Sequence, residues 1–127
     1  MSLDELIILP TVDTPAIIMR PGEIIIKGRS VKIIDPVSFG KIESWVNSYI
    51  ADPADITTVN VYLEYLNTGN LLYYLNILRK FITIKSKGRE LVINWYHDKE
   101  DEDIIDKGEY LASLLDIKFN FILIPGL

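Results

Sequence analysis

A single threonine, Thr68, stands where a predicted strand passes into a predicted helix, and its hydroxyl group could carry a phosphoryl group there. Residues 57–66 alternate apolar and polar side chains, as strands do, and residues 71–82 repeat apolar side chains at helical spacing. The polar joint between these segments consists of Asn67, Thr68, Gly69 and Asn70. The start of a helix presents unpaired backbone N–H groups and partial positive charge, so it tolerates a phosphoryl group.

The joint also has a simpler interpretation, because asparagine and threonine side chains cap helices. Capping the first N–H groups stabilises a helix by about 1 kcal/mol, and Gly69 suits a plain turn. Both interpretations stay open on spacing alone. Tyr73 and Tyr74 are adjacent on the predicted helix and point in different directions, so an exposed ring near Thr68 could anchor a partner.

Few other side chains in the sequence could take part in catalysis, and this scarcity argues against an enzyme. The chain has no cysteine and one histidine, His97. Catalysis by His97 would need a nucleophile or a second acid–base group nearby, and the sequence shows no such pattern around it. The acidic residues from Asp98 to Glu109 lack the spaced ligands and central glycine of a calcium loop, and they suit a solvated helix start. A partner-facing patch and a metal-assisted hydrolase are the alternatives. We expect no catalytic residue, no metal and no cofactor.

Composition limits the class of protein and its partners. The 127 residues, 49% hydrophobic, suffice for one domain over residues 1–127 with its own core. The net charge of −5 disfavours nucleic acid as a partner. The N-terminus does not resemble a signal peptide, and the apolar runs fall far short of the roughly 20 residues of a membrane helix. The lack of cysteine fits a reducing compartment, so we expect a cytoplasmic bacterial protein without a membrane partner.

The elements that position the joint alternate along the chain. Pro21-Gly22 lies between two apolar runs and predicts an N-terminal β-hairpin, and Asp35-Pro36 is typical of a helix start. Residues 6–9 form either an edge strand or an irregular lead-in. The predicted strands are 16–19, 23–27, 57–66, 91–96 and 119–124, and the predicted helices follow residues 35, 70 and 103. This order predicts an α/β fold with a mixed sheet, parallel in its later part, and about three helices packed mostly on one face.

Apolar spacing also predicts which side chains are buried, with Trp45 and Trp95 in the core. On the strand before the joint, one face carries Val59, Val61, Leu63 and Tyr65. On the helix after it, the buried side carries Leu71, Leu75, Leu78 and Ile82, with Leu72 and Phe81 beside them.

Three motifs, taken in order, resemble one protein family over almost the whole chain. They are Pro10-Thr-Val-Asp-Thr-Pro15-Ala-Ile with Gly22-Glu-Ile-Ile-Ile-Lys-Gly28-Arg-Ser30, then Leu63-Glu-Tyr-Leu-Asn-Thr68, then Asn94-Trp-Tyr-His-Asp-Lys-Glu-Asp-Glu-Asp103 with Lys107-Gly-Glu109. The chain thereby resembles the SiaC-type bacterial regulatory phosphoproteins. The resemblance implies a fold similar to that of anti-sigma-factor antagonists (STAS-like).

The resemblance also implies a non-enzymatic partner switch. A serine/threonine kinase would phosphorylate a hydroxyl group at the helix start, and a metal-dependent serine/threonine phosphatase would remove the phosphate. The unmodified form would bind an effector, which in this family can be a diguanylate cyclase linked to biofilm formation. In this sequence Thr68 is the candidate phosphoacceptor, and the candidate partner-binding residues are Asn67, Gly69, Asn70 and Tyr73.

The joint departs from the family at one point. The family usually continues Asn-Thr with several serines and then a lysine, whereas here Thr68 is followed by Gly69-Asn-Leu-Leu-Tyr73. The alternative hypothesis is therefore a constitutive protein-interaction module that has lost the phosphorylation switch.

Overall fold

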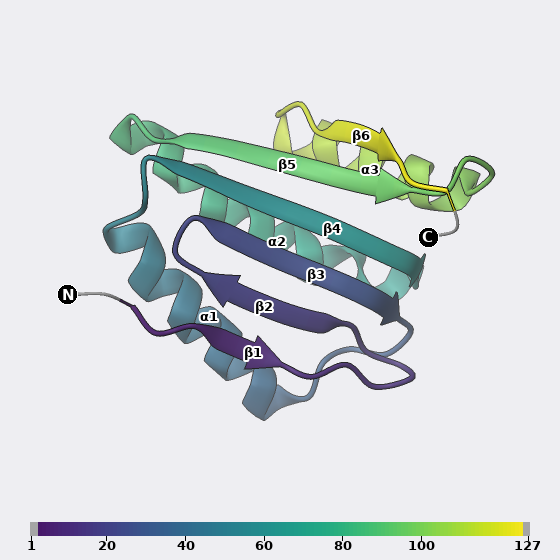
Figure 1. Ribbon diagram of the computed structural model, residues 1–127, viewed down its shortest axis with the longest axis horizontal. Coiled ribbons are helices and arrows are strands. Elements are labelled where there is room, and N and C mark those ends of the chain that lie inside the picture. Colours follow the sequence, from purple (N-terminus) through teal and green to yellow (C-terminus); the bar gives the residue numbers. More distant parts are fainter. Residues whose placement is uncertain (1–2, 126–127) are drawn as a thin grey trace.

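The computed structural model describes residues 3–125, which form one six-stranded sheet in the order β1-β2-β3-β4-β5-β6 (Figure 1). The strands are Leu6–Ile8 (β1), Ala16–Arg20 (β2), Glu23–Ser30 (β3), Ile56–Leu66 (β4), Glu90–His97 (β5) and Asn120–Leu123 (β6). β1, β2 and β3 pair antiparallel, and β3 to β6 pair parallel. The mixed sheet is confirmed, and the open question about residues 6–9 resolves in favour of a strand. Residues 1–2 and 126–127 of the expected domain lie outside the described residues.

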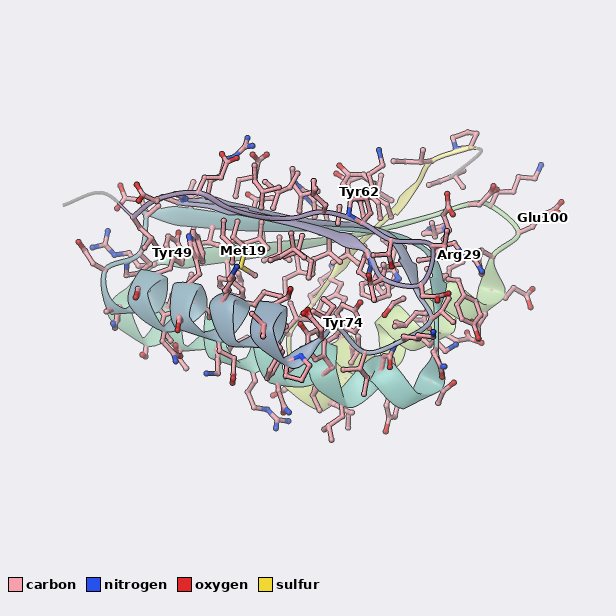
Figure 2. All side chains as sticks on the ribbon, turned by 90° about the horizontal axis from the view of Figure 1, so that it is seen from below. Met19, Arg29, Tyr49, Tyr62, Tyr74 and Glu100 are labelled. Carbon is pink, nitrogen blue, oxygen red and sulfur yellow. The ribbon has the colours of Figure 1, made fainter. Side chains whose placement is uncertain are left out.

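Three α-helices cover one face of this sheet. They are Pro36–Ala51 (α1), Leu71–Ile82 (α2) and Glu102–Leu115 (α3), and two short 3-10 helices, Thr68–Asn70 (η1) and Thr83–Lys87 (η2), flank α2. Figure 1 shows all three α-helices behind the sheet, and Figure 2 shows them on one side of it, with Tyr62 pointing away from them and Met19 toward them. Among residues 3–125, no helix lies on the other side of the sheet, which we call the open face.

The core lies between the sheet and the helices and includes Trp45 and Trp95, which are 6% and 1% exposed. The indole Nε1 of Trp95 donates a hydrogen bond of 2.8 Å to the backbone oxygen of Ile104 in α3. Beside it, Gly108 lets α3 approach closely, because a Cβ atom there would lie 2.6 Å from Trp95 Nε1. This contact holds α3 against β5.

Two burial predictions next to the joint are wrong. Between β3 and β4 the register shifts, with Gly28 opposite Leu63 but Arg29 opposite Tyr65, so β4 has one extra residue there. Such a bulge turns the next side chains to the opposite face. Tyr65 is accordingly 39% exposed and Leu66 is 0% exposed.

The second error concerns α2. Leu72 is 64% exposed, whereas Tyr74 and Ile77, which the leucine spacing did not single out, are 2% and 4% exposed. The helix therefore turns Tyr74 rather than Leu72 toward the sheet. In the described part of the chain, no helix combines the length and the apolar character that crossing a membrane requires.

Candidate protein-docking site

The joint is fixed by Asn67, which follows the last residue of β4. Its backbone N–H donates to the oxygen of Ser30 at 2.8 Å, and its Nδ2 donates to the oxygen of Val31 at 3.1 Å. Its Oδ1 accepts a hydrogen bond of 2.9 Å from the Gly69 N–H, so Asn67 caps η1. The capping interpretation thus applies to Asn67. Thr68 is exposed and is the first residue of η1, which leads directly into α2.

Asn70, expected among the partner-binding residues, faces inward. It is 4% exposed, and its Nδ2 donates to the Ser30 backbone oxygen at 3.2 Å and to Ser30 Oγ at 3.1 Å. The hydroxyl of Tyr74 donates to the same Ser30 Oγ at 2.7 Å. Burial raises the pKa of Tyr74 to about 12, although the bond to Ser30 opposes that shift. Asn70 therefore anchors the joint to the end of β3 instead of presenting its amide at the surface.

Tyr73 is half-buried between α1 and α2. Its ring lies 4.9 Å from that of Phe39 and 5.3 Å from that of Tyr74, measured between centroids. Its hydroxyl is buried and has no hydrogen-bond partner among the described residues. Burial, with smaller contributions from Tyr74 and Glu43, raises the pKa of Tyr73 above its ordinary value. The structure thus brings Asn67, Thr68 and Gly69 together at the surface and sets Tyr73 apart from them.

A groove of about 490 Å³ opens beside Thr68, between α2 and α3. Three of its apolar side chains are strongly exposed: Leu72 at 64%, Tyr110 at 54% and Leu114 at 46%. The lining residues are Thr68, Leu71, Leu72, Leu75, Asp106, Lys107, Tyr110, Leu111 and Leu114. An apolar floor with a few charged groups at its edge suits a protein partner.

Sequence reasoning missed this groove, although the chain holds a signal for it. Leu72 follows a buried-side leucine, Leu71, and Leu114 precedes another, Leu115. Such doublets widen the apolar stripe of a helix beyond what one layer of packing needs. Two widened stripes on adjacent helices predict an apolar groove between them.

Lys107 links α3 to the joint. Its Nζ donates to the Leu66 backbone oxygen at 2.6 Å and to Asp103 Oδ2 at 2.7 Å, and its side chain is 13% exposed. The same Nζ lies 5.8 Å from the ring centroid of Tyr65, a cation–π contact. A lysine from the third motif thus holds the end of β4 next to Thr68.

The acidic segment forms the start of α3. Asp101 caps that helix, accepting from the Ile104 N–H at 3.2 Å, and Glu102 and Asp103 lie in its first turn. The His97 Nδ1 lies 2.9 Å from the Asp98 backbone oxygen. Residues 3–125 contain no group of three or more histidine or acidic side chains arranged to hold a metal ion. The solvated-helix interpretation describes Asp101, Glu102 and Asp103 well.

Comparison with known proteins gives concordant results. The pattern of the family described as SiaC family regulatory phosphoprotein matches residues 8–124. An uncharacterized protein of Pseudomonas aeruginosa is 27% identical over 109 residues, which is 84% of this chain and 86% of that protein.

Two solved structures share the architecture. Apo-SiaC from Pseudomonas aeruginosa is 25% identical, with a TM-score of 0.78 over 95% of this chain and 98% of that one. A structure described as diguanylate cyclase SiaD in complex with its activator SiaC, from the same organism, matches with 26% identity and a TM-score of 0.76, over 93% of this chain and 97% of that one.

Proposed function

Because the chain belongs to the SiaC family of regulatory phosphoproteins, we propose that it activates a diguanylate cyclase by docking through the groove between α2 and α3. The family is regulatory rather than enzymatic, and its member SiaC is the activator of the diguanylate cyclase SiaD, with which it forms a complex. We place the protein in the bacterial cytoplasm, upstream of cyclic-dinucleotide control of biofilm formation.

The observation that carries this proposal is the position of Thr68 at the edge of an exposed apolar groove. Leu72, Tyr110 and Leu114 together offer a partner an apolar surface that the fold itself leaves in water. Burying apolar surface contributes about 25 cal/mol per Å², so covering these three side chains favours association and offsets part of the cost of immobilising the partners. Gly69 is exposed and Asn67 is partly exposed, one on each side of Thr68 in the chain. A partner seated in the groove would reach both residues.

Phosphorylation of Thr68 would then control docking. A kinase transfers the γ-phosphoryl group of ATP to Thr68 Oγ1, which loses its proton, and ADP leaves. A metal-dependent phosphatase adds water across that bond and releases inorganic phosphate. The phosphothreonine carries about −1.5 to −2 charges. The helix start tolerates this charge, whereas a partner covering the groove would have to desolvate it.

The proposal is tested by titrating the SiaD-like cyclase of the same organism with the wild-type protein, with Thr68→Glu and with Thr68→Val. Valine removes the hydroxyl without adding charge, so it should bind like the wild type. Glutamate, or phosphothreonine at position 68, should weaken binding by about a hundredfold, or ~2.7 kcal/mol, and lower cyclase activation in parallel. Wild-type affinity in the glutamate and phosphothreonine proteins would refute the switch, and no binding by the wild type would refute the docking.

The second candidate is a constitutive interaction module without a switch. It is favoured by the joint itself, where Gly69 and Asn70 stand in place of further hydroxyl groups and Asn70 is committed to the buried contact with Ser30. Mass spectrometry of the protein isolated from its own cells decides between the two. A phosphate on Thr68 under any growth condition supports the switch, and its consistent absence supports the constitutive module.

A further inference from the structure

Lys107 is placed to respond to a phosphoryl group on Thr68. We propose that Lys107 exchanges its contact with Asp103 for an ion pair with phosphothreonine 68, so that the modified protein closes the mouth of its own groove. This inference rests on the proposed modification of Thr68 and goes beyond it, because it assigns a receptor for the phosphate within the same chain.

The contacts of Lys107 bring its ammonium group to the joint. Its Nζ lies 2.6 Å from the oxygen of Leu66, which is two residues before Thr68. Both Thr68 and Lys107 line the groove, one from the start of η1 and the other from α3. Because α3 is held to β5 by the Trp95–Ile104 hydrogen bond and the close approach at Gly108, the ammonium group stays near the joint.

Lys107 is the one cation among the described residues that line the groove, and Asp106 is the one acid there. The basic residues of α2, Arg79 and Lys80, lie in its last turn. At about 1.5 Å per residue, Arg79 is about 16 Å from Thr68 along the helix. Arg29, near the end of β3, lies 5.5 Å from the same Tyr65 ring that Lys107 contacts, but it does not line the groove. Among the residues that line the groove, a phosphoryl group that gains a cation is therefore expected to gain Lys107.

The exchange with Asp103 is favourable for two reasons. The Asp103 side chain is 61% exposed, so water replaces the lost ammonium group at little cost. A phosphate brings a larger charge and three acceptor oxygens, and bonds between ionised partners are the strong ones. An ammonium group has three donors, so Lys107 can keep the Leu66 carbonyl while it binds the phosphate. The resulting bridge would join the start of α2 to α3 over the groove.

The experiment uses the full-length protein with phosphothreonine incorporated at position 68. The second pKa of the phosphate, ordinarily about 6, is followed by phosphorus NMR in the wild type, Lys107→Gln, Lys107→Arg and Lys118→Gln. Lys118 is exposed and follows α3 outside the groove, so its substitution makes the same charge change elsewhere. Besides Lys107, the charged groups around this position are Asp106 in the groove lining, Asp103 bound to Lys107, and Arg29 on the Tyr65 ring that Lys107 also contacts.

An ion pair lowers the phosphate pKa, so Lys107→Gln should raise it by about one unit relative to the wild type, a tenfold change in proton affinity. Lys107→Arg should keep the low value, and Lys118→Gln should match the wild type. Equal values in the wild type and Lys107→Gln would overturn the proposal.

A second measurement leaves Lys107 intact and so avoids any effect of its substitution on folding. Phosphorylation should move the carbon chemical shift of the Asp103 carboxylate toward that of a solvated carboxylate, and an unchanged shift would contradict the exchange. Neither measurement uses a cyclase or a kinase. Failure here therefore leaves docking through the groove untouched, and failure of cyclase binding leaves the Lys107 contact testable.

Discussion

The groove and the open face of the sheet are both exposed, but they differ in how far their side chains contact and hydrogen-bond one another. On the open face, Asn94 donates to Asn60 at 2.9 Å and Asn120 donates to Asn94 at 3.0 Å, across three adjacent strands. The rings of Tyr62 and Tyr96 stack there with centroids 4.1 Å apart (Figure 2 shows Tyr62 on this face).

In the groove, by contrast, Leu72, Tyr110 and Leu114 present apolar surface to water. Cross-strand pairs satisfy a sheet face without a partner, whereas exposed apolar side chains gain free energy only when something covers them. Exposure alone therefore does not favour one of these two surfaces for docking, whereas the lack of internal pairing favours the groove.

The largest effect is expected from a substitution in the groove, which tests the difference between the groove and the open face directly. Leu72→Asp should weaken cyclase binding by about a hundredfold, or ~2.7 kcal/mol, because it places a charge on the apolar floor of the groove. The fold should survive, since Leu72 is 64% exposed and an acid near a helix start is favourable. The matched control is Ile7→Asp in β1, at 54% exposure with the same charge change. Calorimetric titration measures both, and equal losses would show that the groove has no special role.

The second effect concerns the packing that positions the groove. Gly108→Ala should lower the free energy of unfolding by about 1–3 kcal/mol, because the new Cβ atom would lie 2.6 Å from Trp95 Nε1 and push α3 outward. Gly40→Ala, in α1 with no atom within 4 Å of the added Cβ, should be neutral or slightly stabilising. Urea unfolding of the two variants measures the difference. A Gly108→Ala protein as stable as Gly40→Ala would mean that α3 shifts freely.

The sequence could predict some parts of this structure and not others. Local patterns predict the strands, the Asp35 cap and the leucine face of α2, because the signals for these features lie within a few residues of one another. The bulge before Tyr65 depends on the pairing of β4 with β3, which no local pattern records. Asn70 looked exposed because polar residues usually are, yet its partner Ser30 lies 40 residues away.

The contact of Lys107 was out of reach for the same reason, whereas the leucine doublets of α2 and α3 held a signal for the groove. The acceptor of Lys107, the Leu66 carbonyl, is 41 residues away in the chain. The groove exists only once α2 and α3 lie side by side. The joint that holds Thr68, in contrast, could be placed because the end of a strand and the start of a helix are both local signals.

The third prediction tests the buried polar network behind the joint by its response to alkali. Burial raises the pKa of Tyr74 to about 12 from an ordinary value of 10.0. Between these values the folded protein keeps the proton that the unfolded chain loses. This contribution to stability is therefore complete below pH 10 and decreases as pH rises toward 12, by at most about 1.4 kcal/mol per unit.

Tyr74→Phe removes this titration, so its free energy of unfolding should fall less steeply above pH 10 than that of the wild type. Denaturant unfolding at several pH values gives both slopes. Tyr73 also has a raised pKa and titrates in both proteins, and Tyr74 contributes to that shift, so the difference between slopes reports Tyr74 together with its effect on Tyr73. Parallel curves would mean that the Tyr74 hydroxyl is more accessible to water than its 2% exposure indicates.

The smallest effect is expected on the open face. Asn94→Ala removes the middle of the asparagine row and should cost about 0.5–1 kcal/mol of unfolding free energy, because water can replace both lost hydrogen bonds on a face that carries no helix. Cyclase binding should not change, since the row lies across the sheet from the groove. If Asn94→Ala weakened binding as much as Leu72→Asp does, the row would be part of an interface, and internal pairing would lose its value as a sign that a surface needs no partner.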